Sequence, residues 1–289
     1  MVDGALTNLT GKPTPASAWR SLLSPKEIVG LKVYSKPGPR SGTRPAVVAA
    51  VVQGLLSAGL PATNIVIWDR QKEDLIQAGY DQLAKRLGVQ LEAAASAGYD
   101  TNTFYETSLV GQLVAGDVEF GKNGETVGRK SYVTKLMVNR LTKIINISPL
   151  LNHYHFGVTG NLFSLAFGSV ENTRRFDPPR GTLAQKAIPE IYAMEAIGDK
   201  VVLNIVDALI CQYEGEQTSF LEFSTTLNEL RFSTDPVALD VLSLYELERQ
   251  RKEPSKYSSI TNVIGVYQIA GIMDIGVSTP RNIRIERMR

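Results

Sequence analysis

The chain has 289 residues, of which 43% are apolar, and carries a formal net charge of +2. A chain of this length can bury one large core or two moderate ones. Its 31 basic and 29 acidic residues are mixed along the sequence, which does not give the electrostatic footprint of a nucleic-acid binder. No apolar run is long enough to cross a bilayer. We therefore expect no nucleic-acid partner and no membrane span.

The cysteine content limits the cofactors. One cysteine, Cys211, cannot form an internal disulfide, a cysteine-based zinc site or an iron–sulfur cluster, so a cluster is not expected. The N-terminal MVDGALTNLTGKP lacks the basic start and the apolar stretch of a signal peptide. As given, the chain is typical of a cytoplasmic protein, or of an exported protein whose leader is missing.

The first ninety residues alternate between strand-like and helix-like patterns. In chain order we expect short helices at 2–9 and 16–23, a strand at 28–33, a helix at 45–59, a strand at 64–70 and a helix at 74–87. The strand IVGLKV, a Gly/Pro/basic loop, a helix that begins at Pro45 and the strand NIVIWDR are typical of a right-handed βαβ unit.

The same alternation continues after a less regular segment. Residues 93–130 are rich in Gly, Thr and Asp, and form either a loop excursion or a small β insert. The remaining expected elements are a helix at 132–141, a strand from 143, helices at 159–167 and 183–196, a buried strand at 201–210, a strand at ELRFS, helices from 236 and near 263–273, and a last strand, NIRIERM. In S-T-D-P, Asp235 can cap a helix whose first position is Pro236.

This order predicts an α/β protein: a mainly parallel sheet flanked by helices, with a small loop-rich insert. We expect one domain over residues 1–289, with the insert near 93–130.

Polar residues follow several of the predicted strands. Lys36, Arg40 and Arg44 follow the first strand and can orient an anion, and Asp69 ends the second. His153 and His155, the only two histidines, follow the strand KIINI. Asp207 lies in the strand VVLNIVDALI. Ligands of open parallel sheets bind beyond the carboxyl ends of the strands, so we expect these groups to share one rim.

The segment GVTGN, which follows the histidines, has the composition of a ligand-binding turn. Its small residues let the backbone approach a ligand. Thr159 can cap the helix that begins there, and with Asn161 it can contact a substrate, because free N–H groups at a helix start attract anions. Arg174 and Arg175 follow soon after and can add positive charge.

We predict His153 as a general base or a metal ligand, with Asp207 or Asp69 as its carboxylate partner. Each feature also has a purely structural explanation. The histidines can simply be hydrogen-bonded within a turn, the basic loop can be a solvated connection, and Asp207 can hold a neighbouring loop. His153 and His155 can also bind a divalent metal ion, although the sequence does not identify a cofactor.

From about residue 27 onwards, the chain resembles the domain-of-unknown-function 362 family. The resemblance rests on these segments in order: VGLKV, the basic loop, NIVIWDR, KIINISPLLNH, GVTGNLFSLAFG and FSTDPVALDVL. The most specific pieces are a histidine followed by GVTG, and S-T-D-P-V-A-L-D; His153 occupies the motif position. The resemblance implies an uncharacterised protein. Some members carry ferredoxin-like cysteine motifs, which this chain lacks.

A more distant likeness is to the nickel-pincer lactate racemase family, whose Thr-Arg-Pro helix is similar to TRPAVVAAVVQGLLSAGL. The Asp-His expected before Thr43 is Ser41-Gly42 here, so the likeness implies architecture alone.

Two functions remain open. The first is an enzyme that acts on a small anionic or carbonyl-bearing substrate at the strand rim, through acid–base or metal chemistry centred on His153. The second is a non-catalytic binding or assembly subunit on the same scaffold. A homo-oligomer is compatible with both.

Overall fold

The fold, taken from a computed structural model, is built on one large sheet. The structure describes residues 1–176, 181–215, 221–251 and 260–288. In order across the sheet, the strands are β3 (Gln90–Ala93), β2 (Ile65–Asp69), β1 (Val29–Val33), β6 (Lys143–His153), β8 (Val201–Gln212) and β9 (Ser224–Ser233), and β7 (Gly157–Val158) pairs with β6. All neighbours from β3 to β8 are parallel, whereas β9 is antiparallel to β8. The predicted mainly parallel α/β sheet is confirmed.

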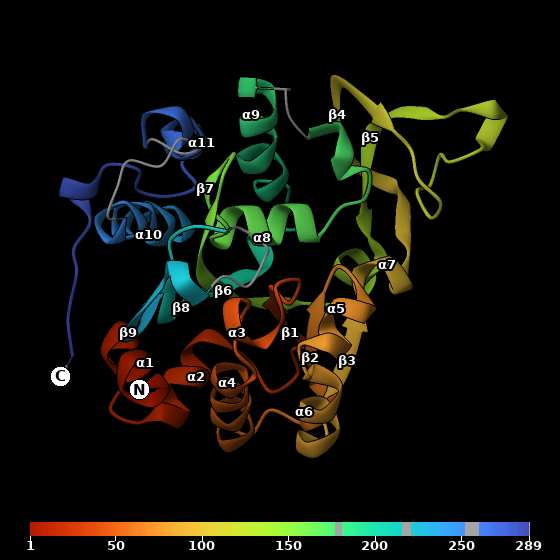
Figure 1. The fold of residues 1–289 in the computed structure, drawn as a ribbon. Helices are drawn as coiled ribbons and strands as arrows, with labels where there is room; N and C mark the ends of the chain where they lie inside the picture. Colours follow the sequence, from red (N-terminus) through yellow and green to blue (C-terminus); the bar gives the residue numbers. More distant parts are fainter. Residues whose placement is uncertain (177–180, 216–220, 252–259, 289) are drawn as a thin grey trace.

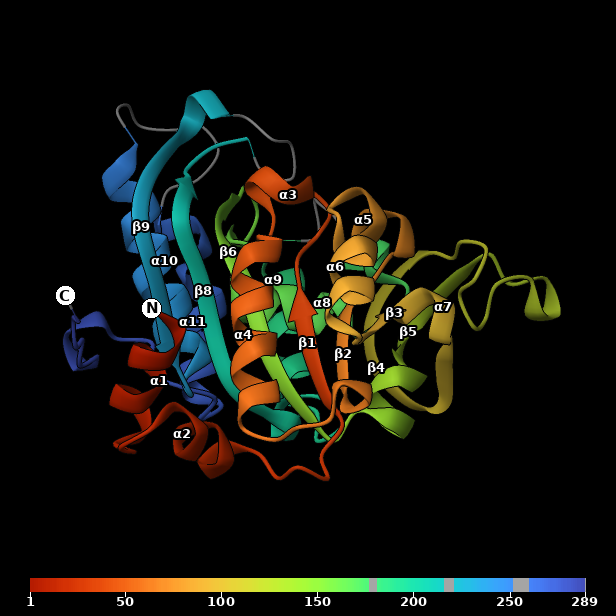
Figure 2. The ribbon, with the colours of Figure 1, turned by 90° about the horizontal axis from the view of Figure 1, so that it is seen from below.

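Helices cover both faces of this sheet (Figures 1 and 2). One face carries α1 (Val2–Thr10), α2 (Pro15–Leu22), α4 (Pro45–Ser57) and α6 (Tyr80–Leu87), and the other carries α8 (Asn161–Gly168), α9 (Gly181–Tyr192), α10 (Pro236–Gln250) and α11 (Ile260–Ile272). Each layer encloses its own apolar cluster against the sheet. Because β1 and β2 are buried on both faces, their sequences are nearly continuous apolar runs.

The insert is a two-stranded antiparallel ribbon, β4 (Tyr99–Gln112) and β5 (Val127–Thr134), which projects from one side of the molecule (Figure 2). It begins after the short helix α7 (Ala94–Ala97). Of the two alternatives expected near 93–130, a loop excursion or a small β insert, the structure has the β insert.

Three predicted elements differ in the structure. The helix at 74–87 is two helices, α5 (Lys72–Gln77) and α6, because Gly79 adopts a left-handed φ of 85° between them. The helix at 132–141 is instead the end of β5 followed by a π-helical turn, Leu136–Arg140, since Ser131 and Tyr132 pair with β4.

The prediction of a last strand at NIRIERM was also wrong. The segment begins in a 3-10 turn (Pro280–Asn282), and no residue from there to 288 is in a strand. Asn8 Nδ2 donates to Glu286 Oε2 at 2.9 Å, so the segment lies against α1. A strand forms only where the segment pairs with another strand, and this segment pairs with none among the described residues. None of the described helices is long and apolar enough to cross a membrane.

Candidate functional site

The segment after β1 forms the cover of the carboxyl end of the sheet. It contains the short helix α3 (Gly38–Ser41) and closes on itself, because Thr43 N donates to Tyr34 O and Tyr34 N donates to Thr43 Oγ1, both at 2.9 Å. Thr43 Oγ1 also donates to Ile147 O of β6 at 2.7 Å. We call residues 34–44 the rim loop.

Asp69, at the end of β2, anchors one side of the rim loop. Its Oδ2 accepts from Ser35 N at 2.8 Å and from Ser35 Oγ at 2.6 Å. Its Oδ1 accepts from Lys32 Nζ at 2.9 Å and from Arg70 N at 2.8 Å. Both carboxylate oxygens therefore have donors from the surrounding chain, namely Lys32, Ser35 and Arg70, and none of these donors is an imidazole.

Lys32 is the buried cation beneath this anchor. Its side chain is fully buried, and Nζ donates to Val33 O at 2.7 Å and to Ser164 Oγ at 3.1 Å as well as to Asp69. Burial lowers the pKa of Lys32, and Asp69 acts in the opposite direction. Sequence analysis missed this residue, although a lysine inside the apolar run IVGLKV was a signal that could have found it.

Asp207, in β8, anchors the other side of the rim loop. Arg44 N donates to its Oδ2 at 2.9 Å, and Arg44 Nη1 donates to its Oδ1 at 2.8 Å. Leu209 N also donates to Oδ1 at 3.3 Å. Burial raises the pKa of Asp207, and Arg44 opposes that shift. The predicted anion-orienting Arg44 thus neutralises an internal carboxylate, whereas Lys36 and Arg40 lie exposed on the loop.

His153, the last residue of β6, lies among aromatic rings. Its ring centroid is 4.5 Å from that of Phe163 and 4.8 Å from that of Phe156. Burial is the main cause that lowers the pKa of His153 to about 3, with smaller contributions from His155 and Lys36. Since His155 N donates to His153 Nδ1 at 3.3 Å, the neutral imidazole carries its proton on Nε2.

The rim loop and His153 meet through Phe163 of α8. The Phe163 ring packs against Tyr34, with centroids 6.4 Å apart, and also against His153. Lys36 follows Tyr34 by two residues, and its charge acts on the imidazole. An exposed ammonium and a neutral imidazole therefore share one part of the rim, with the exposed His155 beside them.

The start of α8 is capped by a residue from another helix. Asn161 N and Leu162 N donate to Asp240 Oδ1 and Oδ2 at 2.6 and 2.9 Å, and Asn161 Nδ2 donates to Oδ1 at 3.1 Å. The expectation that Thr159 caps this helix was wrong: its Oγ1 donates to Asn152 O at 3.5 Å. These N–H groups donate to Asp240. The anion that we expected at the helix start is therefore a carboxylate of the protein itself.

Asp240 is the second functional candidate that sequence analysis missed. It is 1% exposed, and burial raises its pKa to about 7 against the opposing hydrogen bonds from α8. The α8-facing side of the sheet carries further buried polar groups. Asn146 Nδ2 donates to Asn161 O at 2.8 Å, and Asn204 is its neighbour on β8. The signal for Asp240 was an acidic residue inside the apolar stretch VALDVL.

Arg175 lies elsewhere, under the β4–β5 ribbon. Its guanidinium is fully buried and donates to Ser131 Oγ at 2.9 Å and to the carbonyls of Tyr105 and Leu109 at 2.9 and 3.0 Å. These contacts hold the Arg175 guanidinium within the ribbon, whereas we expected it to add positive charge near the histidines. Arg174, its neighbour, is exposed.

Two further observations concern ligands. Within the described ranges, no group of three His, Cys, Asp or Glu side chains could hold a metal ion. Where the lactate racemase likeness would require an acid–base pair, Gly42 packs so closely that an added Cβ would lie 2.6 Å from Tyr34 O. Ser41 and Gly42 supply neither carboxylate nor imidazole, so we derive no nickel chemistry for this chain.

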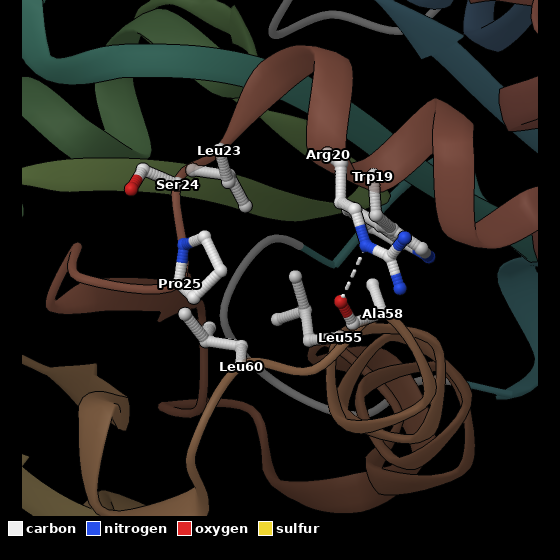
Figure 3. A pocket seen from close by; sticks show the side chains of 8 residues that line it. All are labelled: Trp19, Arg20, Leu23, Ser24, Pro25, Leu55, Ala58 and Leu60. Carbon is white, nitrogen blue, oxygen red and sulfur yellow. Dashed lines mark hydrogen bonds between the residues drawn. The ribbon is translucent and has the colours of Figure 1, made fainter.

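A shallow hollow lies between α2 and α4 (Figure 3). Its lining is mainly apolar, and Arg20 Nε closes one side by donating to Ala58 O at 2.9 Å. Pro25 and Leu60 of this lining precede β1 and β2, which places the hollow at the amino ends of the strands. It therefore lies at the opposite edge of the sheet from His153. The lining residues are Trp19, Arg20, Leu23, Ser24, Pro25, Leu55, Ala58 and Leu60.

The chain belongs to the family described as "Domain of unknown function (DUF362)", whose model matches residues 29–245. No curated protein matches its sequence. A Thermotoga maritima protein of known structure is similar at 16% identity and a TM-score of 0.39, covering 66% of this chain and 48% of that one. The lactate racemase apoprotein from Thermoanaerobacterium thermosaccharolyticum is similar at 12% identity and a TM-score of 0.42, covering 70% and 46%. The chain thus spans less than half the length of either.

Proposed function

We propose that this protein is an enzyme that binds a small anionic or carbonyl-bearing molecule at the carboxyl rim of the sheet, beside His153. The observation that carries the proposal is the course of the rim loop. Its hydrogen bonds reach β2 through Asp69, β6 through Ile147 and β8 through Asp207. Lys36 belongs to this anchored loop, and its charge acts on the buried imidazole of His153.

The two groups have complementary chemistry. An ammonium such as Lys36 offsets the charge of a carboxylate or phosphate. The neutral His153 imidazole, with its proton on Nε2, can donate a hydrogen bond to a carbonyl oxygen and can polarise it. With a pKa of about 3, His153 serves this role across the neutral range without becoming charged.

Asp69 and Asp207 take positioning roles in this proposal. Each accepts hydrogen bonds from the rim loop itself, and Asp69 is held by Lys32 as well. They fix Lys36, Arg40 and the loop backbone relative to His153. A general-base pair of His153 with either carboxylate is therefore not part of the proposed mechanism.

Nuclear magnetic resonance of the imidazole nitrogens tests the proposal, because the chain has only two histidines. The His155→Gln variant assigns the signals. Addition of inorganic phosphate or pyruvate should shift the His153 signals in a saturable way. Lys36→Gln should weaken that binding about ten-fold, as expected for loss of a charged hydrogen bond. Lys85→Gln, which removes an exposed lysine from α6, is the matched control. Unmoved signals at about 10 mM of either probe, or equal binding by Lys36→Gln, would refute the proposal.

The internal pairing of Asp69 and Asp207 favours a second candidate, a non-catalytic binding or assembly subunit. Native mass spectrometry with metal analysis separates the two. A monomer or closed dimer supports the enzyme, and a stoichiometric metal ion would add metal chemistry to it. An extended, metal-free assembly supports the second candidate.

A further inference from the structure

Strand β9 ends the sheet on the side opposite the β4–β5 ribbon (Figure 2). All ten of its residues are at least partly exposed, whereas its neighbour β8 is mostly buried. Within the part of the chain that the structure describes, no strand pairs with its outer edge. An open edge presents unpaired backbone N–H and C=O groups, which are a template for another strand.

The charges of β9 select one partner for this edge, a second copy of the same strand. Glu229 and Arg231 lie two residues apart, on the same face, with Arg231 Nη2 2.9 Å from Glu229 Oε2. In an antiparallel self-pair centred on Leu230, each Glu229 lies opposite the other copy's Arg231. A one-residue slip of the centre would instead place two glutamates or two arginines opposite each other, which is unfavourable.

A bulge sets the length of the available edge. Asn228 has a positive φ of 57°, and the β8–β9 register shifts between Ala208 and Ile210. From Glu229 to Ser233 the register with β8 is regular. Leu230 is the second residue of this regular segment, so a self-pair centred on it matches Glu229 with Arg231 on both sides before it reaches the bulge at Asn228.

The surface beside this edge carries several exposed apolar side chains among charged ones. Helix α1 contacts β9, and the C-terminal segment lies on α1 through Asn8 and Glu286. A Cβ on Gly4 would lie 2.9 Å from Met288 Cε, which places the end of the segment there too. Exposed apolar side chains gather on these two segments: Met1, Leu9, Ile285 and Met288. A two-fold pairing of β9 brings the same surface of a second copy alongside.

We infer that the protein forms a two-fold symmetric dimer in which β9 of each copy pairs antiparallel around Leu230 and continues the sheet across the interface. Two Glu229–Arg231 pairs between the copies set the register. The apolar side chains of α1 and the C-terminal segment are covered by the partner. Such an interface uses the same patch on both copies, as a closed dimer requires.

Charge reversal tests this arrangement by sedimentation equilibrium of the full chain. The wild type should be a dimer at micromolar concentration. Glu229→Arg and Arg231→Glu should each raise the dimer dissociation constant about ten-fold or more, because each places like charges opposite each other twice. The double variant Glu229→Arg/Arg231→Glu should restore most of the affinity. Lys85→Glu, at an exposed ion pair on α6, should leave it unchanged.

The single variants need a folding control, since Arg231 also lies 3.7 Å from Glu246 of α10. Circular dichroism and thermal unfolding at low concentration provide it, and the more exposed Glu229 gives the cleaner variant. Hydrogen exchange should show that amides of β9 gain protection as concentration rises. A wild-type monomer at about 100 µM, or a dimer that tolerates both single reversals, would overturn the inference.

Discussion

Lys32 and Asp69 form an ion pair in the interior of the protein, with Nζ 2.9 Å from Oδ1 and side-chain exposures of 0 and 7%. The pair joins β1 to β2 at the carboxyl ends of both strands. The ammonium also donates to Ser164 Oγ of α8, and the carboxylate also holds Ser35 of the rim loop. The rim loop and the helix that carries Phe163 are thus linked through two buried charges.

Removing one of these charges should be strongly destabilising. Lys32→Met leaves the carboxylate of Asp69 buried without its cation, and we expect a loss of about 3–5 kcal/mol in the free energy of unfolding. Denaturant unfolding measures it. The double variant Lys32→Met/Asp69→Leu should lose less than the sum of the two single variants, because no charge is stranded.

Lys85→Met is the matched control for this prediction. Its ion pair with Asp81 is 3.9 Å long and its side chain is 81% exposed, so the change should stay within about 0.5 kcal/mol. Equal effects of Lys32→Met and Lys85→Met would show that the buried pair does not stabilise the fold.

Asp240 should make stability depend on pH in an unusual direction. Its pKa in the folded protein is about 7, above the ordinary value of 3.8, so the folded state binds this proton more tightly than the unfolded state does. Its contribution to stability therefore decreases as pH rises from about 4 to 7 and is constant above 7. At 1.36 kcal/mol per pKa unit, the decrease is roughly 4 kcal/mol.

Denaturant unfolding of wild type and Asp240→Asn over this pH range isolates that contribution. The free-energy difference between the two proteins should shift in favour of the asparagine variant as pH rises. Asn161→Ala keeps the acid but removes one donor to it, so it should make the pH dependence of the wild type steeper. A constant difference between wild type and Asp240→Asn would show that this carboxyl does not titrate in that range.

Local signals explain which parts of the fold were predictable. Asp235 accepts from Ala238 N at 2.8 Å and precedes Pro236, so the start of α10 agrees with the sequence because cap and helix are adjacent residues. The strands and helices of the βαβ unit were predictable for the same reason. The strand prediction for NIRIERM was wrong because this segment lies against α1 and pairs with no strand among the described residues, although its residues alternate.

The candidate site was harder to predict because its partners are distant in sequence. Thr159 satisfies the local rule for a helix cap, yet Asp240, seventy-nine residues away from Asn161, takes that role. Arg44 and Asp207 are separated by 163 residues; Arg44 was expected to orient an anion and Asp207 to be the carboxylate partner of His153. Sequence indicated that these polar groups share a rim, but only the strand order determines which of them neutralise each other.

His153 should make the fold sensitive to acid. Its pKa falls from 6.5 to about 3 on burial, so between these values the unfolded state binds more protons than the folded state. The contribution of His153 to the free energy of unfolding is therefore fully present above pH 6.5. It is lost progressively as the pH falls to 3, by roughly 5 kcal/mol in total. His153→Phe should reduce this loss, whereas His155→Gln should retain it.

The imidazole nitrogens report the same property directly. At pH 5, the His153 signals should still show a neutral ring protonated on Nε2. A pH titration by nuclear magnetic resonance measures this, with His155→Gln for assignment. A midpoint for His153 near 6.5 would contradict the burial that the structure gives this ring.

Arg175 should control the β4–β5 ribbon separately from the rest of the protein. Its guanidinium donates to the carbonyls of Tyr105, Leu109 and Arg129, which bridges both strands, and it stacks 4.6 Å from the Phe176 ring. Arg175→Met fills a similar volume but leaves these buried acceptors without a donor. At about 1–3 kcal/mol for each unsatisfied group, we expect the ribbon to open locally.

Hydrogen exchange and limited proteolysis distinguish this local opening from global unfolding. Amides of β4 and β5 should lose protection in Arg175→Met, and cleavage should concentrate between residues 112 and 127, while β1 and β6 keep their protection. Arg174→Met removes an exposed arginine next in sequence and should behave as wild type. Loss of protection throughout the large sheet would mean instead that the ribbon and the sheet unfold as one cooperative unit, and that Arg175 stabilises the whole fold.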